Sequence, residues 1–184
     1  MSMARDVRKS KAKKMRPIFF VFCEGETEVS YVNYLKSKYR FPIQIVPKKS
    51  DSSISCRYIE NCKREYFTTN SDKTFLMYDL DVDGVLEKLT SISGVTLLIS
   101  NPCVELWFLL HNQECKSELN TKRCVEKYES VSTEYKKGTL NAFDLQIFNQ
   151  GEDAAIARAK KLNTPGNPST TVYKLLEALR EESL

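Results

Sequence analysis

The sequence predicts an α/β fold with a mostly parallel central sheet flanked by helices, followed by a helical C-terminal extension. Short apolar runs alternate with segments of helical periodicity up to residue 112, whereas only helical patterns follow. Alternating strands and helices of this length imply right-handed crossovers and therefore parallel strands.

Four short segments read as strands, and the first of them, 17–23, is continuously apolar and rich in β-branched or aromatic residues. Such runs are typical of strands that are covered on both faces of a sheet. The predicted strands are 17–23, 43–47, 74–78 and 95–100.

The segments between these strands have apolar residues at helical spacing. The predicted helices are 27–38, 54–66, 85–89, 103–111, 121–131, 153–162 and 169–182. Thr27 is the expected N-cap of the first helix, and Pro102 suits the first helical position of the fourth. Asn101 and Asn167 are expected to act first as N-caps and second as ligand contacts.

The chain has 184 residues, which suits one compact domain. We expect a basic flexible arm at 1–16, an α/β core at 17–112 and a helical extension at 113–184 that packs on the core. No apolar run approaches the roughly 20 residues that span a bilayer, and the basic start lacks a signal-peptide core. The sequence therefore predicts a cytoplasmic protein without a membrane role.

The six cysteines are expected to be reduced and mostly buried. No CxxC pair occurs, and His111 is the only histidine, so the spacing disfavours a zinc site.

Much of the positive charge lies in the N-terminal arm. Candidate nucleic-acid-binding residues there are Arg8, Lys11, Lys13 and Lys14, within the basic run from Arg5 to Arg16. Such an arm can bind phosphates and release counterions, although a solvated terminus has the same composition.

Polar residues follow each predicted strand, at the edge where open parallel sheets bind ligands. Glu24 follows the first strand, Asp79 and Asp81 follow the third, and Ser100 and Asn101 end the fourth. The second strand is followed by two bases, Lys48 and Lys49, which are candidates for phosphate binding, with Lys48 also a candidate for catalysis.

Asp79 and Asp81 are two residues apart on an extended segment, so their side chains project to the same side. Like charges this close repel each other unless a cation lies between them. Carboxylate ligands favour Mg²⁺, or Mn²⁺, which usually also contacts substrate phosphate. Asp83 is a further candidate ligand, although alone it reads as a solvated turn residue, as do Glu26 and Glu28.

Several other functions fit the sequence less well. The run from Asp79 to Gly84 resembles an EF-hand start, but Thr90 stands where that loop needs glutamate. A haloacid-dehalogenase-type phosphatase matches only partly around Val82, and no Walker A loop occurs.

Two segments together resemble the Toprim domain of topoisomerases, primases and several nucleases. They are Phe22-Cys-Glu-Gly-Glu-Thr-Glu28 and Asp79-Leu-Asp-Val-Asp-Gly84. The resemblance implies a Toprim-like Rossmannoid core in which Glu24 is a general acid or base. It also implies that Asp79 and Asp81 bind Mg²⁺ and that Asp83 supplies a further acidic contact.

Two further segments resemble the RloB-like family over nearly the whole chain. They are Ser100-Asn-Pro-Cys-Val-Glu-Leu-Trp-Phe-Leu-Leu-His111 and Asn167-Pro-Ser-Thr-Thr171. Members of that family are encoded near restriction and other phage-defence loci. The resemblance implies a nuclease, because we expect a chain of this length to be too short for the additional domains of topoisomerases and primases.

Glu105 lies in an apolar helix, where a buried acid requires a partner. Two alternatives remain open from the sequence: Glu105 serves the acidic site in catalysis, or it pairs with a basic residue of the helical extension. His111, at the end of the same helix, is expected to pack or cap rather than to react.

The leading expectation is a Mg²⁺-dependent nuclease acting on DNA or RNA, with a defence-system protein as a candidate partner. The first alternative is a non-catalytic nucleic-acid-binding or regulatory subunit. A small-molecule phosphohydrolase is a third, weaker reading of the same carboxylates.

Overall fold

The computed structural model describes residues 16–47 and 54–183. The strands are β1 (Phe19–Cys23), β2 (Ile43–Pro47), β3 (Lys73–Asp79), β4 (Thr96–Asn101) and β5 (Ser169–Thr170). The helices are α1 (Glu26–Tyr39), α2 (Cys56–Lys63), α3 (Val85–Thr90), α4 (Glu105–Asn112), α5 (Thr121–Val131), α6 (Ala142–Ala159) and α7 (Tyr173–Ser183).

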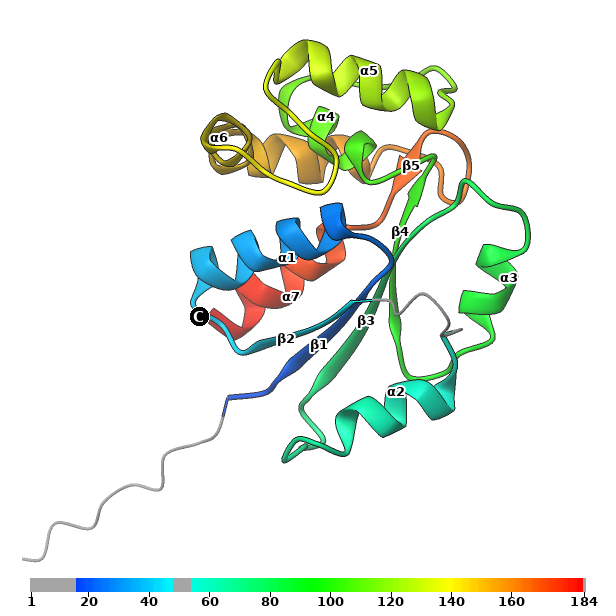
Figure 1. Cartoon of the computed structure of the whole chain (residues 1–184), viewed down its shortest axis with the longest axis vertical. Helices are drawn as coiled ribbons and strands as arrows, with labels where there is room; N and C mark the ends of the chain where they lie inside the picture. Colours follow the sequence, from blue (N-terminus) through cyan, green and yellow to red (C-terminus); the bar gives the residue numbers. More distant parts are fainter. Residues whose placement is uncertain (1–15, 48–53, 184) are drawn as a thin grey trace, which may run out of the picture.

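The strands form one five-stranded sheet in the order β2-β1-β3-β4-β5 (Figure 1). The pairs β1–β2, β1–β3 and β3–β4 are parallel, and β5 pairs antiparallel with β4. The predicted α/β fold with a mostly parallel sheet is therefore confirmed.

The interior strand β1 is buried on both faces, which explains its continuously apolar sequence. Phe19 and Val21 belong to a core cluster shared with α1, α4, α5, α6 and α7, whereas Phe20 and Phe22 belong to a cluster shared with α2 and α3. Figure 1 shows α1 and α7 on one side of the sheet and α2 and α3 on the other. Residues beyond 112 thus contribute to the same core as the sheet.

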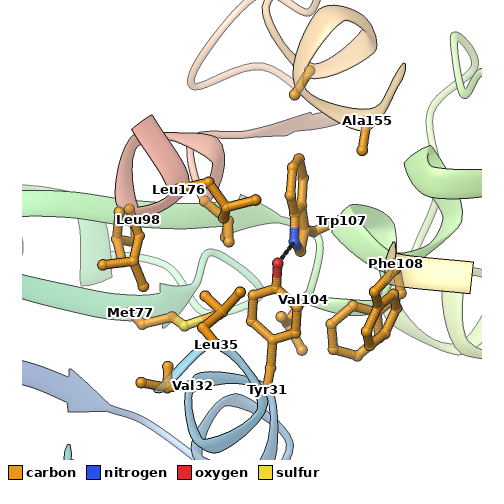
Figure 2. Close-up of a cluster of buried hydrophobic side chains, with 14 of the residues drawn as sticks. Tyr31, Val32, Leu35, Met77, Leu98, Val104, Trp107, Phe108, Ala155 and Leu176 are labelled. Carbon is orange, nitrogen blue, oxygen red and sulfur yellow. Dashed lines mark hydrogen bonds between the residues drawn. The ribbon is translucent and has the colours of Figure 1, made fainter. Parts of the chain in front are cut away.

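A hydrogen bond inside the larger cluster links α1 to α4. The indole Nε1 of Trp107 donates to the hydroxyl of Tyr31 at 2.7 Å (Figure 2). Both side chains are fully buried, and this bond satisfies the indole N–H, which would be costly to bury alone. It fixes the N-terminal halves of α1 and α4 against each other.

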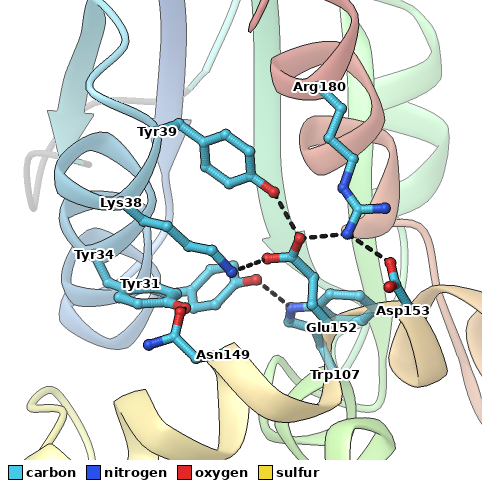
Figure 3. A network of polar contacts seen from close by, with 9 residues as sticks. All are labelled: Tyr31, Tyr34, Lys38, Tyr39, Trp107, Asn149, Glu152, Asp153 and Arg180. Carbon is cyan, nitrogen blue, oxygen red and sulfur yellow. Dashed lines mark hydrogen bonds and ion pairs between the residues drawn. The ribbon is translucent and has the colours of Figure 1, made fainter.

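A polar network around Glu152 joins α1, α6 and α7 (Figure 3). The Glu152 carboxylate accepts hydrogen bonds from Lys38 Nζ at 2.5 Å, Tyr39 hydroxyl at 2.6 Å and Arg180 Nη2 at 2.5 Å. Burial opposes ionisation of Glu152, but these donors outweigh it and lower its pKa. These contacts stabilise the buried charge of Glu152, which thereby has a structural role in holding the three helices together.

Two predicted helix starts in the first 112 residues, those of α1 and α4, are wrong. The N-cap of α1 is Gly25 and not Thr27. Helix α4 begins at Glu105, so Pro102 does not occupy its first position and Asn101 is not its cap. Asn101 ends β4 instead, and its Nδ2 donates to the carbonyl of Pro165 at 2.9 Å.

The C-terminal region also differs from the prediction of helices alone. Residues 169–170 form β5, and the last helix starts only at Tyr173. Asn167 does not cap that helix, because its amide exchanges two hydrogen bonds with the backbone of Leu119, at 3.0 and 2.7 Å. Helix α6 starts well before the predicted residue 153, because Asn141 caps it by accepting from the N–H of Asp144.

The six cysteines are free, and four of them are buried, as expected. Among the helices in the described part of the chain, none combines the length and apolar character needed to cross a membrane.

Candidate active site

A pocket of about 310 Å³ opens at the carboxyl ends of β1 and β3. Its acidic lining residues are Glu24, Glu26, Glu28, Asp79 and Asp81. The parallel pairing of β1 with β3 explains this convergence, because both strands end at the same edge of the sheet. The structure thus brings together Glu24, Asp79 and Asp81, the three acids that the sequence analysis assigned to this edge.

Glu24 is held at both its backbone and its side chain. Its N–H donates to the carbonyl of Met77 at 3.1 Å, which continues the β1–β3 ladder by one residue. Its Oε2 accepts the backbone N–H of Asp79 at 3.1 Å. This arrangement fixes the Glu24 carboxylate beside the end of β3.

Asp79 has an unusual electrostatic environment. Burial, followed by repulsion from Glu28, Glu105, Glu24 and Asp81, raises its pKa from 3.8 to about 9. Asp79 therefore retains a proton at neutral pH when no cation is bound. A cation at the pocket would offset the repulsion and favour the carboxylate form.

Glu28 is buried, contrary to its reading as a solvated turn residue. Its Oε2 accepts the N–H of Gly25 at 3.1 Å, which satisfies one free donor at the start of α1. Burial is the main cause that raises its pKa, with Glu105 and Glu24 adding repulsion. Glu28 is a site residue that the sequence analysis missed, whereas Glu26 is exposed as expected.

Glu105 is fully buried next to this site. Its Oε1 accepts a hydrogen bond from the hydroxyl of Tyr135 at 2.7 Å, while its Oε2 has no hydrogen-bond partner among the described residues. No ion pair there links it to a basic side chain of the C-terminal helices. Its charge raises the pKa of Asp79 and of Glu28, which favours membership of the acidic site over a structural ion pair.

The loop between α5 and α6 completes the pocket from a distant part of the sequence. Lys137 and Gly138 line the pocket together with the acids. The N–H of Gly138 donates to Thr27 Oγ1 at 2.9 Å, and Ser30 Oγ donates to the carbonyl of Gly138 at 2.7 Å. Thr27, expected as a helix cap, thus binds this loop instead.

The chemistry of these side chains suits a hard divalent cation such as Mg²⁺ or Mn²⁺, which prefers carboxylate oxygens. The unpartnered Oε2 of Glu105 and the crowding around Asp79 are features that a cation would stabilise. Within residues 16–47 and 54–183, however, no three acidic, histidine or cysteine side chains are already spaced as a metal site. Mg²⁺ usually keeps several waters and is bound through one or two carboxylates, so a pair of these side chains suffices in chemical type.

The other sequence candidates lie elsewhere. Asp83 is exposed and does not line the pocket. His111 is buried in α4, where its Nδ1 contacts the carbonyl of Trp107 at 2.9 Å and burial lowers its pKa to about 4. Lys48, Lys49 and the basic-arm candidates Arg8, Lys11, Lys13 and Lys14 fall outside the described residues.

A larger pocket of about 510 Å³ lies at the C-terminal ends of α4 and α6. It contains both bases and acids, including Lys161 and Glu114, and shares no residue with the acidic pocket. Its Arg158 donates from Nη1 to the carbonyl of Leu110 at 2.6 Å, which is a structural contact. This pocket offers no comparable group of reactive side chains.

A family model described as RloB-like protein matches residues 19–179 of the chain. The match covers most of the sequence, including β1, β3, α4 and the loop that carries Lys137. No curated protein and no solved structure matches the chain significantly. The chain therefore belongs to the RloB-like protein family.

Proposed function

We propose that this RloB-like protein is a metal-dependent nuclease that hydrolyses phosphodiester bonds in DNA or RNA. The observation that carries the proposal is the convergence of Glu24, Glu28, Asp79 and Asp81 in one pocket at the carboxyl ends of β1 and β3. Such a cluster favours a divalent cation, and Mg²⁺ in proteins commonly contacts substrate phosphate. The resemblance of Glu24, Asp79 and Asp81 to the Toprim acids supports the same chemistry.

The side chains have distinct roles in this proposal. Asp79 and Asp81 would hold the cation, which when bound neutralises charge on the scissile phosphate. Glu24 accepts the proton of the attacking water, because its carboxylate is fixed by the N–H of Asp79 and lines the pocket. Glu105 and Glu28 keep the local potential negative, so the pocket favours a divalent cation.

Family membership supports a role in a restriction-linked locus or in anti-phage defence. A nucleic acid is then the substrate, and another protein of the defence system is a candidate partner. Both belong to the proposal.

The test is to incubate purified protein with labelled duplex DNA and with tRNA in Mg²⁺, in Mn²⁺ or in EDTA. We expect shorter fragments only with a divalent cation, and their loss in Glu24→Gln, Asp79→Asn and Asp81→Asn. Glu87→Gln is the matched control, because Glu87 is an exposed acid of α3 outside the pocket. Cleavage that persists in EDTA, or in all three site variants, would exclude the proposed chemistry.

One observation favours a second candidate, a non-catalytic nucleic-acid-binding or regulatory subunit. The described side chains do not form a ready-made three-ligand metal site. This candidate predicts that the protein binds DNA or RNA but produces no fragments with any added divalent cation. Calorimetric titration of Mg²⁺ and Mn²⁺ into wild type and Asp79→Asn adds a direct measure of cation binding.

A further inference from the structure

The α5–α6 loop is fixed to the acidic site at three points. The N–H of Gly138 donates to Thr27, and the carbonyl of Gly138 accepts from Ser30. The Tyr135 hydroxyl donates to Glu105. Thr27 and Ser30 lie in the first turns of α1, directly after Glu24 and Gly25. The position of this loop is thus coupled to the carboxylates themselves.

Lys137 lies between these fixed points and lines the pocket. It is the one basic residue among the described lining residues, which otherwise comprise five acids, two glycines and a threonine. Its side chain is exposed and forms no ion pair within the described part of the chain. The ammonium group is therefore free to contact an anion that enters the pocket.

A buried carboxylate beside the pocket lacks part of its hydrogen bonding. Glu105 is fully buried, and its Oε2 lacks a hydrogen-bond partner in the described residues. A buried carboxylate oxygen without a donor is destabilising, and it adds to the negative potential of the adjacent acids. An anionic phosphate would be repelled by the acids unless positive charge accompanied it.

We propose that Lys137 binds a phosphate group of the nucleic-acid substrate at the mouth of the acidic pocket. Thr27 and Ser30 are positioning residues, because they hold Gly138 and thereby the backbone beside Lys137. The inference rests on the proposed function, since it names the group that receives the substrate phosphate at that same site.

The first experiment measures binding without cleavage. Affinity for labelled duplex DNA and for a labelled RNA hairpin is measured in EDTA over a series of salt concentrations, beginning at low salt. Lys137→Ala should reduce the magnitude of the slope of log affinity against log salt concentration by about 0.7–0.9, the change expected for the loss of one phosphate contact. Lys136→Ala is the matched control, because Lys136 is also exposed but does not line the pocket. An equal slope for wild type and Lys137→Ala on both probes would overturn the inference.

The second experiment measures cleavage with Mg²⁺ or Mn²⁺. Lys137→Ala should lower kcat/KM by about tenfold or more, the size expected for a lost charged hydrogen bond, with a rise in KM. Lys137→Arg should retain most of the activity, because it keeps the charge. Loss of activity in Lys136→Ala to the same degree would show that overall charge matters, and not the position of Lys137.

The positioning role has its own test. Thr27→Val removes the acceptor for Gly138 and should lower kcat/KM less than Lys137→Ala does. The double variant should lose little beyond Lys137→Ala alone, since both changes act through one contact. If the losses of kcat/KM in the two single variants add fully in the double variant, Thr27 does not act through Lys137.

The outcomes distinguish the two proposals. If wild type cleaves with metal and Lys137→Ala matches it in slope and in kcat/KM, this inference fails while the nuclease proposal stands. If wild type does not cleave but the salt slope still depends on Lys137, the phosphate contact stands and the nuclease proposal fails.

Discussion

Replacing Asp79 with asparagine should stabilise the metal-free protein at neutral pH. In the folded protein the pKa of Asp79 is raised from 3.8 to about 9, so the folded state binds a proton that the unfolded state has lost. A group with a raised folded pKa contributes stability that is fully present below its unfolded pKa and is lost as pH rises toward the folded pKa. Asparagine resembles the protonated side chain and avoids this loss.

The size of the effect follows from the pKa shift. One pH unit is worth about 1.4 kcal/mol for each proton retained, so the interval from 3.8 to neutral pH amounts to roughly 4 kcal/mol. Asp79→Asn should therefore raise the free energy of unfolding by up to about 4 kcal/mol at neutral pH in EDTA. The difference should shrink to near zero as the pH falls toward 3.8.

The assay is urea unfolding of both proteins in EDTA at several pH values, repeated with Mg²⁺. Asp81→Asn is the control, because it removes an exposed carboxylate from the same segment and should change stability by less than about 0.5 kcal/mol. Added Mg²⁺ should stabilise wild type more than Asp79→Asn. A pH-independent difference, or a destabilised Asp79→Asn protein at neutral pH, would refute the electrostatic reasoning.

Three further predictions concern Glu105, His111 and Gly151. Glu105→Gln should leave the melting temperature unchanged or raise it, because the change removes repulsion between Glu105 and Asp79. Cation affinity or cleavage should fall by about an order of magnitude. A loss of about 1–3 kcal/mol in stability with retained activity would instead indicate a structural role. Burial lowers the pKa of His111 from 6.5 to about 4, so the free energy of unfolding of wild type should fall by up to roughly 3 kcal/mol as the pH falls through this interval. In denaturation curves measured in parallel, the free energy of unfolding of His111→Gln should fall by less. Gly151→Ala should destabilise the folded protein by about 1–3 kcal/mol, since the new Cβ would overlap the His111 carbonyl where α6 packs on α4. The measurement is urea unfolding, and an unchanged midpoint would argue against this packing.

β1 and β3 could be predicted because nearly all their residues are buried, which requires continuously apolar sequences. β2 occupies the predicted residues 43–47, and β1 lies within the predicted segment 17–23. The two-residue strand β5 was missed, because a segment this short has no periodicity of its own and depends on pairing with β4. Asn167 illustrates the same limit: its sequence neighbours suit an N-cap, but its partner is the distant backbone of Leu119.

The site was predictable only in part. Strand ends identify Glu24, Asp79 and Asp81 as neighbours, because parallel strands deliver them to one edge. Glu28 carried a usable signal, since it stands four residues before Val32 and seven before Leu35, on the buried face of α1. That spacing indicated burial even though a glutamate in a first helical turn is usually solvated.

Lys137 and Tyr135 could not be found from local sequence, because polar residues before a glycine are typical of an ordinary loop. Their place at the site depends on hydrogen bonds between residues far apart in the sequence. Gly138 bonds to α1 across more than 100 residues, and Tyr135 bonds to Glu105 across 30 residues. Glu105 is fully buried, and its one hydrogen-bond donor in the described structure is Tyr135. A fragment ending at residue 112 would therefore leave this carboxylate without a donor and the pocket without its lysine. It follows that the α/β core alone, although it supplies the acids, does not contain the complete site.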